Sequence, residues 1–264
     1  MIYYYSGCGN SRWLANELAA GLGEELFFIP DLLRSIGMLP GGEGRKTSDP
    51  MEIDVDGRPL GFVFPIYAWA APVLVEDFVS AVRWKGTPSY VWFACTCGDE
   101  MGMTRVTFAK ILKKSGLILD AAYCFQMPET YLCMPGFHLD SEDGARAKIE
   151  AAKAKLPRIL ESIRAHGKVD ELIVGSVPRL KSYFIRPAFV KNASDRQYRV
   201  LDACTGCGKC VRVCPLRNVK LVDGRPQWQG GCTQCMACYQ YCPVNAIQFG
   251  NFTRGKGQYH FPDK

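Results

Sequence analysis

Residues 204–215 read CTGCGKCVRVCP, and residues 232–243 read CTQCMACYQYCP. Both stretches follow the pattern C-x2-C-x2-C-x3-C-P, and the second begins 28 residues after the first. An apolar residue continues the repeat after each Cys-Pro pair, Val219 in the first copy and Ile247 in the second. The last part of the chain is therefore built from two equivalent halves.

This cysteine spacing is the bacterial pattern for cubic iron–sulfur clusters, in which the fourth cysteine of each run ligates the other cluster. Three cysteines in a tight loop can cap one face of a cube, and the proline directs the fourth cysteine toward the second cube. The spacing predicts two 4Fe-4S clusters. We expect one cluster on Cys204, Cys207, Cys210 and Cys242, and the other on Cys232, Cys235, Cys238 and Cys214.

A pair of structural zinc sites is the alternative, because zinc sites also use C-x2-C pairs. Zinc explains neither the third cysteine of each run nor the proline, so the pattern favours iron–sulfur clusters. From about residue 197 onward the chain resembles the two-cluster bacterial ferredoxins at all eight cysteines. The segment between the runs, residues 220–228, reads KLVDGRPQW. Its Asp-Gly pair stands between two short stretches in which apolar and polar residues alternate, which predicts a hairpin.

Charge is distributed unevenly along the 264 residues. Residues 1–174 carry a net charge of −4 and residues 175–264 carry +10. A basic tail is compatible with nucleic-acid binding. Two oxidised cubes with their thiolates would add about −2 each and bring the tail to roughly +6, so we expect no nucleic-acid partner.

Composition bears on where the protein works. The longest uncharged stretch, Leu60–Val75, has 16 residues and contains two prolines, so we expect no membrane span. No basic residue precedes the first apolar run, which predicts no secretory signal. Thirteen cysteines without an export signal indicate reduced thiols or metal ligands and a cytoplasmic protein.

The N-terminal 170 residues alternate short apolar runs with amphipathic segments. Such alternation predicts an α/β fold with a parallel sheet covered on both faces. Residues 37–58, which are rich in Gly, Pro and charge, are expected to form a surface loop or hairpin in place of one helix. The expected strands are Ile2–Tyr5, Glu25–Ile29, Leu60–Phe64, Tyr90–Cys95 and Leu117–Gln126; the expected helices are Ser11–Leu22, Ala71–Val82, Thr104–Lys114 and Glu142–Ala165.

Three segments follow the carboxyl ends of strands in this pattern, where open α/β sheets bind ligands. They read SGCGNS at 6–11, FPIYAWAAP at 64–72 and CTCGDE at 95–100. Taken singly, the first segment is also compatible with a plain turn, and the second with aromatic side chains that only pack. The third is also compatible with cysteines that are small core residues. The candidate cofactor-binding residues are Ser6, Cys8, Gly9, Asn10 and Ser11 in the first, Pro65, Ile66, Tyr67, Ala68 and Trp69 in the second, and Thr96, Cys97, Gly98 and Asp99 in the third.

Together the three segments resemble the loops by which flavodoxins hold FMN, and the resemblance covers residues 1 to about 170. It implies a doubly wound five-stranded parallel sheet of order 2-1-3-4-5, with phosphate on the first loop and an aromatic residue stacked on the flavin ring. Flavodoxins have Ser/Thr-x-Thr-Gly-Asn-Thr where this chain has SGCGNS. Four positions match that pattern, whereas Cys8 lacks the expected hydroxyl.

The two halves together resemble the flavodoxin–ferredoxin fusion proteins of anaerobes, and MPETY at 127–131 is also similar to that family. The implied organisation is an FMN-binding domain over 1–170, a basic and aromatic linker over 171–196, and a small α+β ferredoxin-like two-cluster domain over 197–264. The linker could dock the two domains or form a partner surface, and we expect docking. The pattern gives no indication of an oligomeric state.

Three functions fit this reading. The first is intramolecular electron transfer between FMN, two clusters and an external redox partner, which could be a protein or a small molecule. The second is a flavin-dependent reductase of a small substrate, although no general acid stands out beyond Asp99 and Glu100. The third is a flavin-free binding module. Since no dinucleotide fingerprint is present, direct use of NAD(P)H is not expected.

Overall fold

The structure is a computed structural model that describes residues 1–39 and 50–261. Its centre is a five-stranded parallel sheet in the order β2-β1-β4-β6-β7. Counted along the chain within this sheet, the order is 2-1-3-4-5, which is the flavodoxin-like order of doubly wound folds. The expected fold class is confirmed. The strands are β1 (Ile2–Tyr4), β2 (Leu26–Phe28), β4 (Pro59–Pro65), β6 (Tyr90–Cys97) and β7 (Ala121–Gln126).

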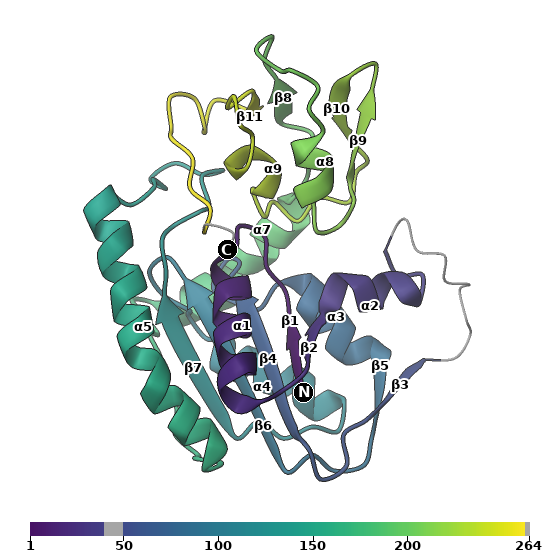
Figure 1. Cartoon of the computed structure of the whole chain (residues 1–264), viewed down its shortest axis with the longest axis vertical. Coiled ribbons are helices and arrows are strands. Elements are labelled where there is room, and N and C mark those ends of the chain that lie inside the picture. The colour runs from purple at the N-terminus through teal and green to yellow at the C-terminus, as the bar shows by residue number, and fades with distance from the viewer. Residues whose placement is uncertain (40–49, 262–264) are drawn as a thin grey trace.

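Helices cover both faces of the sheet (Figure 1). On one face α1 (Asn10–Leu22) and α5 (Glu142–Arg164) bury an apolar cluster with Trp92 and Tyr123. The other face is covered by α2 (Ile29–Ser35), α3 (Val73–Ala81) and α4 (Thr104–Lys114). Burial on both faces accounts for the almost continuous apolar sequence of the central strands.

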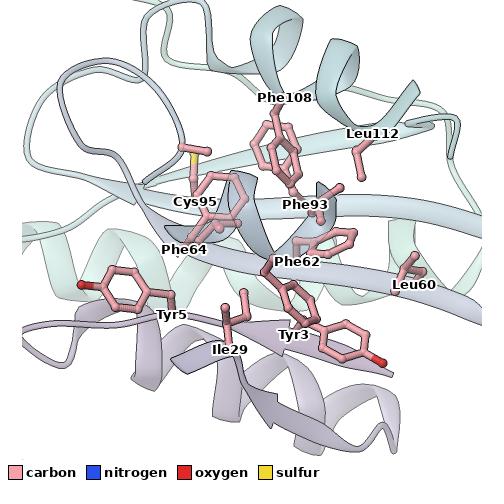
Figure 2. Close-up of a cluster of buried hydrophobic side chains, with 14 of the residues drawn as sticks. Tyr3, Tyr5, Ile29, Leu60, Phe62, Phe64, Phe93, Cys95, Phe108 and Leu112 are labelled. Carbon is pink, nitrogen blue, oxygen red and sulfur yellow. The ribbon is translucent and has the colours of Figure 1, made fainter. Parts of the chain in front are cut away.

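Aromatic side chains fill the second of these clusters (Figure 2). Phe64 of β4 stacks on Phe93 of β6 with ring centroids 5.3 Å apart, and Phe108 of α4 lies 5.0 Å from Phe64. Neighbouring residues along each strand point to the opposite face, as Trp92 does. The sheet is therefore a rigid support whose carboxyl edge carries the loops of interest.

Several element boundaries differ from expectation. Ile29 begins α2 instead of ending a strand, because Pro30 is well suited to the first turn of a helix. Strand β7 begins at Ala121 and not at Leu117. Val82, expected in a helix, begins β5 (Val82–Lys85), which pairs in parallel with β3 (Met51–Asp54). The segment 37–58, expected as a surface loop or hairpin, contributes β3 to this parallel pair, and residues 40–49 lie outside the described residues.

The cysteine-rich part is a small α+β unit. In it β8 (Tyr198–Val200) pairs antiparallel with β11 (Ile247–Phe249), and β9 (Val219–Val222) pairs antiparallel with β10 (Arg225–Trp228). The turn between β9 and β10 has positive φ at Asp223 (49°) and Gly224 (73°), as a type I′ hairpin requires, so the expected hairpin is confirmed. Two short helices, α8 (Lys209–Val213) and α9 (Ala237–Gln240), follow the cysteine loops.

A helical segment connects the two halves. It runs without interruption through α6 (Pro178–Leu180), the π-helical turn η1 (Lys181–Ile185) and α7 (Arg186–Asn192). Figure 1 shows the cysteine-rich unit lying over the end of the sheet from which the strands' carboxyl ends emerge. Among residues 1–39 and 50–261, no helix has the length and apolar character that a membrane crossing demands.

Candidate functional site

The three loops predicted to bind a cofactor meet at the carboxyl edge of the sheet around a cavity of about 460 Å³. Gly9 alone among the fourteen candidate residues does not line it, and instead faces Phe261 and a second cavity. The candidates that line the cavity are Ser6, Cys8, Asn10, Ser11, Pro65, Ile66, Tyr67, Ala68, Trp69, Thr96, Cys97, Gly98 and Asp99.

The first loop turns directly into α1. Gly9 occupies the N-cap with φ of 99°, a conformation that suits glycine, and its N–H donates to Ser6 Oγ at 3.2 Å. Ser11 and Thr96 share a hydrogen bond of 2.7 Å between their hydroxyl oxygens, which ties this loop to the third. The first N–H groups of a helix have no partner within the helix, so this end of α1 can receive an anion.

The second loop is a tight turn held in an unusual conformation. Tyr67 and Ala70 exchange backbone hydrogen bonds of 3.0 and 3.3 Å, and the two residues between them, Ala68 and Trp69, have φ of 48° and 59°. Left-handed non-glycine residues cost on the order of 1–3 kcal/mol each. The connecting segment holds the turn in place, since Ser182 Oγ donates to the Trp69 carbonyl at 2.9 Å.

The connecting segment also forms a wall of the cavity, which the sequence did not reveal. Lys181, Ile185 and Phe189 line it, and Lys181 Nζ lies 5.5 Å from the centroid of the Trp69 ring. Lys181 also forms an ion pair with Glu100. The one available signal was the basic and aromatic composition of this segment.

Glu129 is a further residue of the cavity that the sequence did not single out, although it belongs to MPETY. Burial raises the pKa of its carboxyl group. The side chain accepts hydrogen bonds from the backbone N–H groups of Thr130 and Tyr131 at 2.8 and 2.7 Å. A buried carboxyl group with a raised pKa can hold a proton beside a bound ligand.

The eight cysteines of the two runs fall into the two predicted sets. Cys204 and Cys242 lie close enough to Cys210 to raise the pKa of its thiol. Cys232 and Cys214 have the same effect on Cys238. Cys235 also lies beside Cys214 and Cys232. The fourth cysteine of each run therefore lies near cysteines of the other run. A small cavity is lined by all four members of the first set, namely Cys204, Cys207, Cys210 and Cys242.

The surroundings of these thiols suit clusters. Backbone N–H groups donate to the sulfurs of Cys214, Cys232 and Cys242, each at 3.3 Å. Such donors stabilise thiolates and tune cluster potential. Within the described residues no three His, Cys, Asp or Glu side chains gather tightly enough for a single metal ion. A cube holds its four thiolates on separate iron atoms, so this wider spacing is compatible with clusters.

Cys8 joins the cavity to the cysteine-rich unit. Its Sγ donates to the backbone oxygen of Cys235 at 3.1 Å. Burial raises the pKa of the Cys8 thiol to about 12, so it stays protonated at neutral pH. Cys235 itself lines the cavity, together with Gln234. A cysteine of the second cluster set thus forms part of the wall of the loop cavity.

Comparison with known protein families identifies a domain in the C-terminal part of the chain. Residues 203–247 match the family of 4Fe-4S dicluster domains. The chain therefore joins a flavodoxin-like α/β sheet to an iron–sulfur domain, as the resemblance implied. No curated protein sequence matches the chain.

Among solved structures, similarity is found to a Bacteroides uniformis protein described as a flavoprotein. It shares 14% identity, with 48% of this chain and 88% of that chain covered and a TM-score of 0.33. The Trp repressor binding protein from Bacillus subtilis shares 14% identity over 61% of this chain and 97% of that chain, with a TM-score of 0.35. The fold assignment rests on strand order and direction, not on these two similarities.

Proposed function

We propose that this iron–sulfur protein is an electron-transfer flavoprotein that binds FMN in the loop cavity and exchanges electrons with two 4Fe-4S clusters. FMN would supply one- and two-electron chemistry, and each cluster would supply one-electron chemistry. The proposed units are residues 1–170 for flavin, 197–264 for the clusters, and 171–196 as the link. An external donor or acceptor, a protein or a small molecule, completes the pathway.

The observation that carries this proposal is the position of Cys235. It belongs to the proposed second cluster set and also lines the cavity between the three loops. A flavin in this cavity would lie next to a cluster ligand, and short separation is what electron transfer requires. The first cluster set includes the solvent-exposed Cys207, so electrons could leave the protein there.

The cavity also suits FMN chemically. Its volume of about 460 Å³ lies within the range of small-molecule sites. We assign the phosphate to the loop of Ser6, Asn10 and Ser11 at the N-terminus of α1 and the ring system to Tyr67 and Trp69. Lys181 lines the cavity beside Trp69, with its Nζ 5.5 Å from the centroid of that ring.

The test is a reduction experiment on protein prepared without oxygen. Acid-released flavin and iron are first counted per chain. A sub-stoichiometric one-electron donor is then mixed with the protein while flavin and cluster absorbance are followed separately. We expect both to change, with a rate between them that is independent of protein concentration. Protein with clusters and no flavin would support the binding module, and clusters that never equilibrate with bound flavin would exclude intramolecular transfer.

Glu129 supports a second candidate, a reductase acting on a small substrate at the flavin. Its raised pKa allows the carboxyl group to deliver a proton inside the cavity. Turnover with quinones and other small acceptors should then fall in Glu129→Gln while flavin content stays the same. Equal turnover in both proteins would leave electron transfer as the function.

A further inference from the structure

A second cavity, of about 720 Å³, lies on the other side of the first loop. Gly9, Arg12, Phe28 and Arg34 of the sheet half form one wall. The iron–sulfur half forms the other wall, from residues 211–215 together with Arg217, Val219, Lys220 and Tyr241. Figure 1 shows α8 and β9 above the β1–β2 side of the sheet.

The charged side chains among the described residues that line this cleft are all basic. The lining includes five basic residues and, among the described residues, no Asp or Glu. Asp31 lies outside the lining and forms an ion pair with Arg34. A cluster beside Cys214 would add about −2 to this side of the cleft. The basic residues are Arg12, Arg34, Arg212, Arg217 and Lys220.

Neighbouring groups hold three of these side chains in position. Arg34 is buried and donates to the carbonyl of Pro215 at 2.9 Å. Arg212 donates to the carbonyl of Cys207 at 3.0 Å, and Arg12 hydrogen-bonds the hydroxyl of Tyr241. Guanidinium groups that are already ordered lose little entropy when they bind an anion.

Aromatic rings provide an apolar surface in the same cleft. Tyr4 and Phe28 both line it, with ring centroids 5.0 Å apart. A single phosphate would occupy a small part of 720 Å³, which lies within the usual range for small-molecule sites. The cleft therefore combines charge for phosphate with space and apolar surface for an attached group.

We propose that this cleft binds a small phosphate-bearing anion of nucleotide size. Guanidinium groups bind phosphate through paired N–H donors, and a cleft of one charge concentrates anions from solution. Ser6 and Gly7 line both this cleft and the loop cavity, so a test of this proposal needs protein whose loop cavity is already filled with FMN. Bound there, the anion would contact both halves of the molecule and would lie beside Cys214.

Calorimetric titration of the FMN-saturated protein with clusters tests the proposal. The probes are ADP, pyrophosphate, inorganic phosphate and the uncharged nucleoside adenosine. We expect ADP or pyrophosphate to bind and adenosine not to bind. Tighter binding of ADP would identify a nucleotide, and equal binding of both would identify the phosphate groups alone as the ligand.

Variants locate the site. Arg217→Gln with Lys220→Gln removes two exposed cations of the cleft and should weaken binding at least about tenfold while FMN and iron content stay the same. Lys191→Gln with Arg199→Gln removes the same charge from exposed positions outside the cleft and should bind as the unmodified protein does. No binding of ADP or pyrophosphate at millimolar concentration, or an equal loss of binding in both pairs of variants, would overturn the proposal.

Discussion

The thiol of Cys8 donates to the backbone oxygen of Cys235 at 3.1 Å, across 227 positions of sequence. Cys8 stands in the loop that begins α1, and Cys235 is the second cysteine of the second run. This contact brings the proposed phosphate loop against the proposed cluster ligands. It also accounts for a buried donor at position 8, which a hydroxyl group could replace.

Cys8→Ser should preserve this contact, because a hydroxyl group can donate to the same carbonyl, and should bind FMN as well as the unmodified protein or better. Cys8→Ala should lower the free energy of unfolding by about 1 kcal/mol, the usual net value of such a bond. Urea unfolding and FMN titration measure the two effects. Unchanged stability in Cys8→Ala would show that the bond contributes nothing.

Alkylation tests the same residue by another route. In the absence of FMN the protonated and buried Cys8 should react slowly, and bound FMN should slow the reaction further by covering the loop. Peptide mapping after iodoacetamide treatment follows Cys8 separately from the other cysteines. A loss of redox activity in Cys8→Ser with flavin still bound would instead assign chemistry to this thiol.

Anaerobically prepared protein should contain about eight irons per chain, because two cubes need four cysteines each. Cys207→Ala should remove one cluster and about half the iron. Cys133→Ala alters a buried cysteine outside both runs and should retain all the iron. Iron and sulfide assays measure the change, and stoichiometric zinc in place of iron would contradict the cluster assignment.

Trp69→Ala should weaken FMN binding about tenfold if the indole stacks on the flavin ring, and Tyr67→Ala should act in the same direction. We expect the larger effect at Trp69 because of its larger face. Recovery of flavin fluorescence on dilution gives the dissociation constant. Phe184→Ala, at an exposed position of η1 outside the cavity, is the control. Unchanged affinity in both cavity variants would place the flavin elsewhere.

Ser182→Ala tests whether the connecting segment holds the cavity together. The Ser182 hydroxyl accepts from the Met103 N–H and donates to the Trp69 carbonyl, each at 2.9 Å. Its loss leaves two polar groups without this partner, so stability should fall by about 1–3 kcal/mol and FMN should bind more weakly. Ser80→Ala removes an exposed hydroxyl on α3 and should change neither property.

Glu129 should make stability depend on pH. Because burial raises its pKa in the folded protein above the ordinary value of 4.5, the folded state favours the protonated form. The stabilisation that the Glu129 carboxyl group contributes is fully present below pH 4.5. It is lost as the pH rises through the pKa of Glu129 in the folded protein. Glu129→Gln resembles the protonated form and should gain stability relative to the unmodified protein with rising pH, by about 1.4 kcal/mol per unit of pKa difference.

Thermal unfolding of both proteins from about pH 4 to about pH 8 measures this difference under anaerobic conditions. Glu161→Gln removes an exposed carboxylate of α5 and serves as the charge control. Parallel pH profiles for Glu129→Gln and the unmodified protein would show that Glu129 titrates normally.

Local pattern was enough to predict the main sheet, most of its helices and which cysteines of the two runs lie near one another. Strand alternation, helix periodicity and the C-x2-C-x2-C-x3-C-P spacing all act over a few neighbouring residues, so the sequence displays them directly. The three loops could be predicted for a related reason, since the carboxyl ends of parallel strands share one edge. Short elements such as α2 and β3 lack a long enough period to be detected.

Contacts between distant residues decided the rest. Only the folded chain places Cys235 in the wall of the loop cavity, Ser182 against the turn of Trp69, and Glu129 inside the site. The cationic cleft likewise joins Arg12 and Arg34 to residues almost two hundred positions away. Sequence determined that the C-terminal part is an iron–sulfur domain, because the cysteines of its two runs form local motifs. Tertiary packing decided how close those sites lie, because that depends on how one half is seated on the other.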